Sequence, residues 1–515
     1  MNKNRVYLTL LSSVLLLGFC LRIYQLARYS LWFDEAASVL SADYMHEMIS
    51  KMGMLEERYP SFLSNQFIYY WQRLGKDEFT LRMSAVIFGM LAVLVIYRVA
   101  KHVFSRKAGI IAAFILAVSP IHIYYSREVR VYSLEILTVL VSVYFLIKAL
   151  ESDRMRYWSG YLAFSLASIY LHYMNIFILF SGIIFVLIYY RKCRCLFKRW
   201  LAVNAVLFIF LLPWMINTAY LVKTMFYSSQ KHYWVLWWAG HSFKNILYTF
   251  KNFSAGYNTN AAIYIPLTAI FLIFFSAGLR SKRGSKSGVL FLLCFLIPIF
   301  SMYMISKISP WYVDRYVLPS SIFYYLLVAN GISKMSNRRI LAALCIITAL
   351  LSFGTVNYYK DIIPERHTCL GVGTKKDYRQ AAAYIIDNFQ DGDMIFHVDY
   401  CATLPFEHYF RLIGKDKFEE LSSGNYLLVV EDGEDVVPFK FQERGAKRVK
   451  SDISVENNRR VWLVYSSFVF DTIINYDGKG EMPEEVYIRD HMEKSYIRKD
   501  ARGFKEIIVY LYEKR

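Results

Sequence analysis

The first 358 residues alternate between long apolar segments and short connections rich in Lys and Arg. A helix of about twenty apolar residues is long enough to cross the hydrocarbon core of a bilayer. We therefore expect about eleven membrane-spanning helices, and with them a polytopic α-helical membrane protein. The expected spans are 6–27, 81–103, 108–125, 131–150, 157–173, 175–190, 200–217, 261–279, 288–306, 316–333 and 339–358.

The connections between these spans differ in charge, and the difference predicts their sides of the membrane. With a cytoplasmic N-terminus, the cytoplasmic connections are 101–107, 148–156, 191–199, 280–286 and 334–339, and each is basic. Cytoplasmic loops of membrane proteins carry an excess of Lys and Arg. Because the number of spans is odd, we expect everything after residue 358 to lie outside.

The first outward connection, residues 28–80, is too long for a simple link between spans. Its pattern predicts two interfacial helices, around 36–52 and 61–74. Aromatic side chains along it suit anchoring at the headgroup level or stacking on sugars, and anchoring is their usual role. These aromatic residues are Phe62, Phe67, Tyr69, Tyr70 and Trp71.

Charged residues, glycines and shorter patterns replace the long apolar runs after Tyr359. We expect two domains: a membrane domain at 1–358 and a soluble α/β domain at 359–515. The second domain contains no Gly-rich phosphate loop in a strand and helix context. Its expected helices are 377–388, 402–411 and 482–495, and its expected strands are 394–398, 426–431, 461–467 and 506–513.

Composition narrows the class of protein. Of the 515 residues, 56% are hydrophobic and 17% aromatic, which is more apolar surface than one soluble core can bury. The formal charge of +19 raises the question of nucleic acid, but the excess Lys and Arg falls largely in the short connections. The positive-inside pattern accounts for this charge without a nucleic-acid partner.

The seven cysteines set few constraints. Cys193 and Cys195 lie in a basic connection without a nearby His or a second Cys pair, which argues against a zinc site. Cys369 and Cys401 both lie in the domain expected outside, where a disulfide between them can form. The first apolar run lacks a small-residue cleavage site, so we interpret it as a retained signal anchor.

Two adjacent acids, Asp34 and Glu35, follow the first span directly. Carboxylates are costly against hydrocarbon, so we expect both at the outer interface. A carboxylate at that place can accept a proton from a hydroxyl group. The alternative is that the two acids open a juxtamembrane helix, whose positive N-terminal end favours them.

A second polar cluster, with Arg127, Glu128 and Arg130, occupies the outward turn between the third and fourth spans. If the segment after Ser126 is helical, Arg127 and Arg130 share one face while Glu128 and Tyr132 share another. An arginine pair can hold a phosphate, and Glu128 can orient one of the arginines or the acids of the first loop. The alternative is a structural cluster of salt bridges between two spans.

Asp314 and Arg315 form a third cluster on the outward side, before the tenth span. Arg315 at headgroup level can bind a lipid phosphate and stabilise negative charge on a leaving group. The alternative for Arg315 is ordinary snorkelling to the interface. His172 and Tyr173 end the fifth span on the same side, where a single His is more often a hydrogen-bonded packing residue than a catalyst.

Four segments occur in the order seen in bacterial polytopic glycosyltransferases: Ser30–Ala36, Thr80–Ala85, Ser119–Tyr132 and Asp314–Pro319. Over essentially the whole membrane part, the chain resembles the dolichyl-phosphate-mannose–protein mannosyltransferase-like family. This is glycosyltransferase family 39, whose relatives include the aminoarabinose transferase of lipid A. The segments around Asp377–Arg379 and Asp391–Asp393 also resemble the tail domain of many bacterial members.

The resemblance implies a GT-C fold in the bacterial cytoplasmic membrane, a polyprenyl-phosphate sugar donor and an active site under the first outer loop. It assigns the action on the acceptor to Asp34, with Glu35 beside it. One departure concerns the acceptor, because Arg58–Leu63 stands where many relatives have a His-Pro-Pro-Leu-like segment. The arginine-rich turn of the family carries over to Arg127, Glu128 and Arg130.

The mechanism expected from these residues is a displacement at the anomeric carbon with inversion. Asp34 takes the proton of an acceptor hydroxyl on a glycan, lipid or protein, while Arg127, Arg130 or Arg315 holds the departing phosphate. We expect no cofactor, and no metal ligand set is convincing in the sequence. The alternatives are a transporter or flippase for lipid-linked sugars, and a non-catalytic subunit of envelope assembly.

Overall fold

The computed structural model divides the chain into two compact units. The first contains residues 3–26, 45–227 and 242–372, and the second contains 27–44 and the residues from 375 onward. The division places the acidic segment after the first span with the C-terminal residues. The structure describes residues 3–52, 62–227, 242–280, 285–307, 312–365, 372, 375–397, 400–414, 426–429, 447–449, 459–466 and 493–515.

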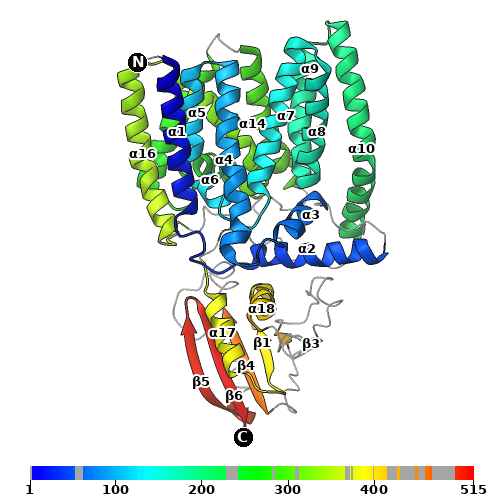
Figure 1. Ribbon diagram of the computed structural model, residues 1–515, viewed down its shortest axis with the longest axis vertical. Helices are drawn as coiled ribbons and strands as arrows, with labels where there is room; N and C mark the ends of the chain where they lie inside the picture. The colour runs from blue at the N-terminus through cyan, green and yellow to red at the C-terminus, as the bar shows by residue number, and fades with distance from the viewer. Residues whose placement is uncertain are drawn as a thin grey trace. The chain divides into compact units, whose positions relative to one another are not determined.

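The first unit is a bundle of helices (Figure 1), and each of the eleven expected spans is helical in it. Among the described residues, seven of these helices are long and apolar enough to cross a membrane, and α5, α8, α9 and α15 are shorter. The protein is therefore a multi-pass membrane protein. The helices are α1 (Lys3–Ile23), α4 (Glu78–Val103), α5 (Arg106–Val118), α7 (Tyr132–Ser152), α8 (Met155–Leu171), α9 (Ile176–Tyr189), α10 (Arg194–Tyr227), α13 (Ala261–Leu279), α14 (Ser285–Ile305), α15 (Ser321–Ile332) and α16 (Asn337–Tyr359).

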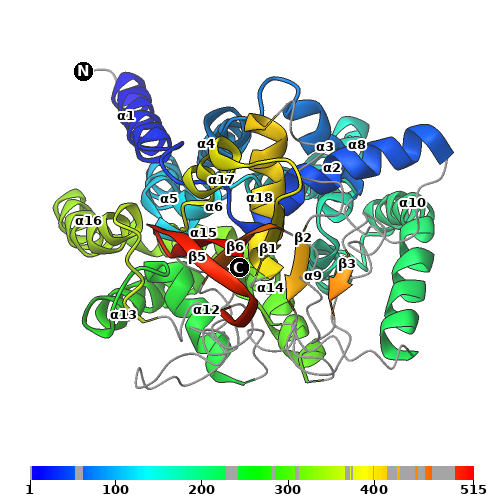
Figure 2. The same ribbon diagram turned by 90° about the horizontal axis from the view of Figure 1, so that it is seen from below.

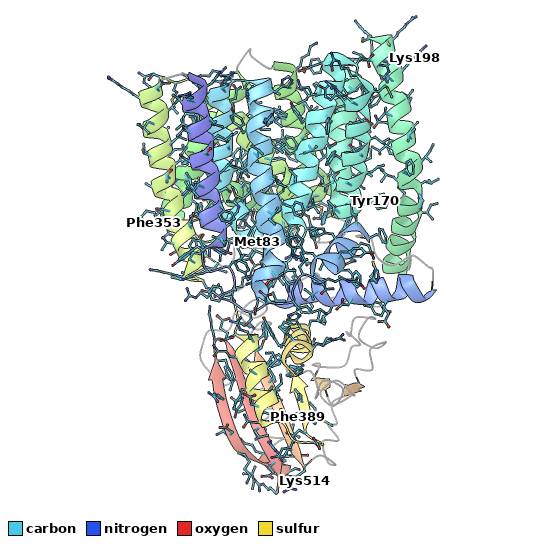
Figure 3. All side chains as sticks on the ribbon, viewed as in Figure 1. Met83, Tyr170, Lys198, Phe353, Phe389 and Lys514 are labelled. Atoms are coloured by element: carbon cyan, nitrogen blue, oxygen red, sulfur yellow. The ribbon has the colours of Figure 1, made fainter. Side chains whose placement is uncertain are left out.

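The outer helices keep large apolar side chains exposed. Phe353 on α16 is 56% exposed and Ile209 on α10 is 67% exposed, and Figure 3 shows Phe353 on the outer side of its helix. A surface of this kind suits contact with lipid chains rather than with water. The exposure agrees with the assignment of these helices as membrane spans.

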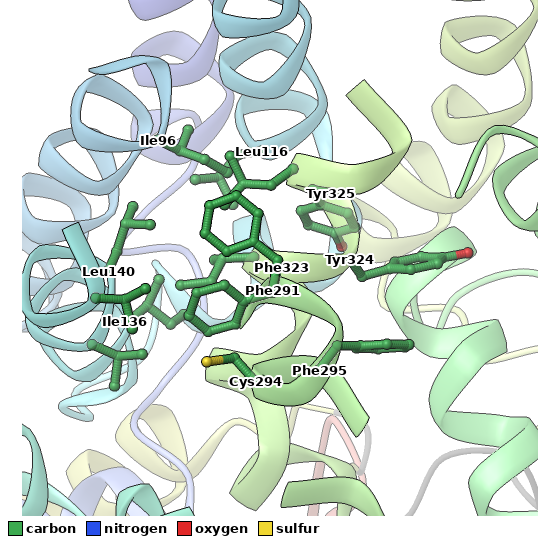
Figure 4. Packing of buried hydrophobic residues seen from close by; sticks show 14 of the residues in the cluster. Ile96, Leu116, Ile136, Leu140, Phe291, Cys294, Phe295, Phe323, Tyr324 and Tyr325 are labelled. Carbon is green, nitrogen blue, oxygen red and sulfur yellow. The ribbon is translucent and has the colours of Figure 1, made fainter. Parts of the chain in front are cut away.

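The core of the first unit lies around α15, all of whose residues are buried. Figure 4 shows Phe323 of this helix beside Phe291 of α14, while Tyr324 points to the other side, where its ring stacks on that of Phe295. Contact between α13 and α15 depends on two glycines. A Cβ atom on Gly278 would collide with the Leu327 carbonyl, and one on Gly331 would collide with that of Phe274. Small residues of this kind let two membrane helices approach closely.

Short elements join these helices. α2 and α3 match the two helices expected in the first outer loop to within three residues. The helix α12 was not expected, because Asn245, Thr249 and Asn252 stand on its buried face where an amphipathic helix would carry apolar residues. The short elements are α2 (Phe33–Met52), α3 (Phe62–Trp71), α6 (Pro120–Tyr125), η1 (Tyr173–Asn175), α12 (Lys244–Ala255) and η2 (Asp314–Ser320).

The second unit has a mixed sheet with the strand order β3-β2-β1-β4-β6-β5 in its described part (Figure 1, Figure 2). The first four strands in this order run parallel, whereas β6 is antiparallel to both β4 and β5. Helices α17 (Tyr378–Asn388) and α18 (Tyr400–Ile413) share an apolar core with the strands. The strands are β1 (Met394–His397), β2 (Tyr426–Val429), β3 (Lys447–Val449), β4 (Arg460–Ser466), β5 (Tyr496–Phe504) and β6 (Ile507–Lys514).

The C-terminal region contains the expected sheet and helices, with α17, α18, β1, β2, β4 and β6 near their expected positions, while the domain boundary at 358 stays a prediction. Strands β3 and β5 were missed, and in β5 most residues are exposed and charged and give no apolar alternation. Charges of this kind are typical of an edge strand. The helix expected at 482–495 falls mostly outside the described residues, and so does Cys369 of the expected disulfide.

Candidate active site

The arginine-bearing turn begins where the expected third span is interrupted. Helix α5 ends at Val118, and Pro120 opens α6 as its first residue. A proline favours this position and drives the residue before it into an extended conformation, and Ser119 has φ −64° and ψ 119°. The Ser119 hydroxyl lies 2.9 Å from that of Tyr325 in the buried helix α15, so the interruption is tied to the core.

The turn itself is not helical, and the expectation that Arg127 and Arg130 share a helix face is wrong. α6 ends at Tyr125 and α7 begins at Tyr132. In between, the Arg127 amide donates to the Tyr124 carbonyl at 3.1 Å and the Arg130 amide donates to that of Glu128 at 2.7 Å. This tight turn sets the directions of the side chains in place of helical spacing.

Arg127 is only 7% exposed. Its Nη2 donates to the Gln25 carbonyl at 3.0 Å, and its guanidinium carbon lies 5.2 and 4.8 Å from the ring centres of Tyr358 and Tyr359. Within the part of the chain that the structure describes, its Nε and Nη1 have no hydrogen-bond partner. A buried guanidinium whose N–H groups lack partners can bind an anion through charge-assisted hydrogen bonds.

A second part of the site is a hydrogen-bonded relay that ends at Asp314. The Tyr125 and Tyr257 hydroxyls lie 2.9 Å apart, and Tyr257 donates to one Asp314 oxygen at 2.8 Å. The Asn252 side chain donates to the other oxygen at 2.6 Å. Burial raises the pKa of the Asp314 carboxyl, and the hydrogen bonds from Tyr257 and Asn252 oppose that rise without reversing it.

His172 connects the turn with the Asp314 and Arg315 segment. Its ring lies 5.3 Å from that of Tyr316 and 5.0 Å from that of Tyr173. Tyr316 follows Arg315 directly, so this ring contact links the end of α8 to the η2 segment. On its other side, the His172 Nδ1 lies 3.7 Å from a carboxylate oxygen of Glu135, which is fully buried.

A buried arginine on α1 holds the end of α5, the helix that precedes α6 and the turn. Arg22 donates to the carbonyls of Ala117 and Leu116 at the end of α5, at 2.8 and 3.1 Å. Gly89 on α4 leaves the space that the Ser126 hydroxyl needs, because a Cβ there would collide with it. The turn is therefore fixed by α1, α4 and α5 as well as by its own helices.

The acidic segment is built differently. Glu35 is fully buried, and its Oε2 accepts a hydrogen bond from the Trp32 amide at 3.3 Å. This is the reach-back contact of a capping box, from the third helical residue to the cap residue. The structure thus gives Glu35 a role at the start of α2, as the juxtamembrane alternative expected, while Asp34 remains half-exposed.

Comparisons with known proteins bear on this arrangement. The chain has the same fold as ArnT from Cupriavidus metallidurans bound to undecaprenyl phosphate, with 13% identity, a TM-score of 0.60 and coverage of 99% of this chain and 98% of that one. The apo state of ArnT gives 12% identity and a TM-score of 0.62 over the same shares. The protein has a GT-C glycosyltransferase fold. This confirms the predicted fold class and the predicted resemblance.

Two further matches are a family model and a second solved structure. The dolichyl-phosphate-mannose-protein mannosyltransferase family model matches residues 63–217, which is less than a third of the chain. The arabinofuranosyltransferase AftD from Mycobacteria matches with 12% identity and a TM-score of 0.50, over 99% of this chain and 41% of that one. A comparison with curated protein sequences gave no match.

The predicted site residues of this GT-C protein divide between the two units. The first unit brings together the α6–α7 turn, the end of α8 and the η2 segment. The second holds Asp34 and Glu35, so a meeting of acids and arginines stays a prediction. The first-unit residues are Arg127, Glu128, Arg130, Tyr132, His172, Tyr173, Asp314 and Arg315.

Several residues and contacts of the site were not predicted from the sequence. The Tyr132 ring lies 4.9 Å from that of Tyr125 across the non-helical turn, a contact that the sequence analysis did not propose. The remaining missed residues are polar groups within apolar helices or an expected loop, and that position was the available signal. They are Arg22, Glu135, Lys251, Asn252 and Tyr257.

Proposed function

We propose that this protein is a membrane glycosyltransferase that moves a sugar from a polyprenyl-phosphate donor to a hydroxyl group outside the cytoplasm. The observation that supports the proposal is the buried guanidinium of Arg127, whose Nε and Nη1 have no hydrogen-bond partner among the described residues. The same fold in ArnT is known with undecaprenyl phosphate bound. A lipid phosphate is therefore the anion proposed here.

In the proposed reaction, the acceptor oxygen forms a bond to the anomeric carbon while the bond from that carbon to the phosphate oxygen breaks. The leaving lipid phosphate takes the electron pair, and Arg127, Arg130 and Arg315 stabilise its growing negative charge. Asp34 takes the proton of the acceptor hydroxyl. Attack from the opposite face inverts the anomeric carbon.

Asp34 is preferred to Glu35 as the base because Glu35 is buried and caps α2. A base must be able to exchange a proton with the acceptor, and a carboxylate held against a backbone amide is less available for that task. Asp34 is half-exposed in the second unit. Glu35 then fixes the first turn of the helix that carries the base.

The proposed location is a bacterial cytoplasmic membrane, with the N-terminus inside and the arginine-bearing turn outside. The support is the charge of the connections, because 101–107, 191–199 and 280–286 are all basic and all lie on one side in this topology. Neither a nucleotide nor a metal has a part in the proposed step. The acceptor class proposed is a glycan, lipid or protein of the cell envelope.

The test is binding of undecaprenyl phosphate to the full-length protein in lipid nanodiscs. Arg127→Ala is expected to weaken binding at least tenfold, because a hydrogen bond to a charged group contributes about 1.5–3 kcal/mol. Arg338→Ala, which changes an exposed arginine at the start of α16, is the matched control and should bind normally. Equal affinity in the two variants would overturn the phosphate assignment.

A further inference from the structure

The second unit has a well-defined edge at which the parallel strands end. β1 ends at His397, and β4, its parallel neighbour, ends at Ser466. Ser466 of β4 pairs with Ile507, the first residue of the antiparallel strand β6. The turn between β5 and β6 therefore lies at the same edge. The strand order reverses at β1, which has β2 on one side and β4 on the other. In open α/β sheets, this edge at a reversal is where ligands bind.

The residues before α17 mark the same edge. Lys376 donates from Nζ to the Ser466 hydroxyl at 2.9 Å, and the Asp377 amide donates to the Lys505 carbonyl, in the β5–β6 turn, at 3.3 Å. Residues 375–377 therefore lie across the carboxyl ends of the strands. They also provide the side chains that contact the first outer loop.

The chain's own segment from Tyr29 to Leu40 occupies this edge. The Lys505 ammonium lies 4.7 Å from the centre of the Tyr29 ring. The Ser30 hydroxyl donates to Asp377 at 3.2 Å and accepts from the Arg379 amide at 3.1 Å. Ser30 is thus held between a side chain and a backbone group at the start of α17.

Contacts continue into the helix that bears the acids. The amide of Leu31, a fully buried residue, donates to the Tyr409 hydroxyl of α18 at 2.8 Å. The Lys375 ammonium lies 4.9 Å from the centre of the Trp32 ring. Farther along α2, Ala36 and Leu40 pack against Leu404 of α18, so apolar contacts complete the attachment.

We infer that the α/β domain binds the first outer loop at its ligand-binding edge and thereby fixes the direction of Asp34. This inference rests on the proposed function, in which Asp34 is the base. Tyr409, Asp377 and Lys375 are then positioning residues, since they act through Ser30–Trp32 on a carboxylate that none of them needs to touch. Residues 29–40 contact the segment 375–379, Lys505 and α18, which lie at the edge where open α/β sheets bind ligands.

The effect on rate follows from geometry. Asp34 stands two residues after Trp32 in the first turn of α2, so the direction of its carboxylate depends on how residues 30–32 are held. A displacement of about 1 Å in a reacting group can cost on the order of a hundredfold in rate. Loss of the Tyr409 hydroxyl also removes this hydrogen-bond acceptor from the buried Leu31 amide, which destabilises the attachment.

The experiment uses the full-length protein in nanodiscs and the variant Tyr409→Phe, which removes one hydroxyl. Hydrogen exchange of the amides at 30–40 should become at least tenfold faster in this variant. Tyr384→Phe removes a hydroxyl that bonds to Asp500 elsewhere in the domain, and it should leave exchange at 30–40 unchanged. Equal exchange in Tyr409→Phe and the unchanged protein would overturn the inference. If Tyr409→Phe does not fold, Ser30→Ala is the second variant. It removes the hydrogen bonds of the Ser30 hydroxyl to Asp377 and the Arg379 amide, and exchange at 30–40 should again become faster.

Activity gives the second readout, in a deletion strain complemented with each variant and scored by mass spectrometry of the envelope glycan that the deletion removes. Tyr409→Phe should lower that glycan about tenfold while undecaprenyl phosphate binds normally. In an Asp34→Asn background, adding Tyr409→Phe should lower the amount of glycan no further. A further loss in that background, or weaker lipid-phosphate binding, would contradict positioning through Asp34. Full glycan in Asp34→Asn alone would refute the proposed function, and the exchange result would still decide whether the edge holds the loop.

Discussion

The arginine-bearing turn between α6 and α7 and the acidic segment at the start of α2 are held by different kinds of contact. Buried side chains fix the turn: Arg22 from α1, the Ser119 hydroxyl and the Tyr257 relay to Asp314. The acidic segment is held by groups of the α/β domain: the Leu31 amide bonds to Tyr409, and the Ser30 hydroxyl bonds to Asp377. In the proposed function, the cations of the turn bind a ligand, whereas the contacts of the acidic segment direct the half-buried carboxylate of Asp34.

The difference predicts which measurement each region controls. Substitutions in the turn should change the affinity for a lipid phosphate. Substitutions in the acidic segment or its attachment should change turnover while binding persists. Variants of the two regions can therefore be compared in the same pair of assays.

The largest effect is expected for Asp34→Asn. The amide cannot take a proton from the acceptor, so the glycan formed in the complemented deletion strain should fall by roughly a hundredfold or more. Binding of undecaprenyl phosphate should stay normal. Asp43→Asn, on the same helix, is the control and should restore the glycan fully. A flippase or a structural subunit would tolerate Asp34→Asn.

Arg127→Lys tests phosphate binding by the arginine-bearing turn. Lysine keeps the positive charge but lacks the planar fork that reaches both the Gln25 carbonyl and an anion. Binding of undecaprenyl phosphate, followed by calorimetry in nanodiscs, should weaken about tenfold or more, because a charge-assisted hydrogen bond is lost. Unchanged affinity would mean that charge alone is sufficient at this position.

Gly89→Ala tests the packing behind the turn. The added methyl group collides with the Ser126 hydroxyl, and excess volume of this kind typically costs about 1–3 kcal/mol in folding free energy. A thermal melt in detergent should show a lower midpoint. The matched control is Gly288→Ala on α14, where a Cβ meets nothing within 4 Å, and its melt should be unchanged or slightly higher.

The smallest effect concerns pH and Asp314. Its pKa is raised in the folded protein because the carboxyl is buried, so the folded state binds a proton more tightly than the unfolded state. The contribution of Asp314 to stability should therefore be fully present below the ordinary pKa range of Asp and should be lost as pH rises through the raised pKa. Asp314→Asn removes this group and should flatten that part of the profile. Parallel melts of the two proteins between pH 4 and 8 test it, and identical profiles would contradict it.

The sequence predicted the helical segments and much of the sheet because both depend on local patterns of apolar residues. It failed where a charged edge strand such as β5 showed no alternation, and where α12 buried a polar face. Within the site, Asp314 and Arg315 were visible as charges beside a span. The partners of Asp314, Tyr257 and Asn252, were not, since contacts between distant segments have no signature in spacing.

The central claim is that Asp34 and Arg127 act on the same lipid-phosphate sugar. The most direct test is a cryo-electron microscopy structure of the full-length Asp34→Asn protein in nanodiscs that contain undecaprenyl phosphate. Phosphate density is expected about 3 Å from the Arg127 Nη1, with residue 34 facing the bound phosphate. Phosphate bound away from Arg127, or residue 34 turned away from the bound phosphate, would contradict it.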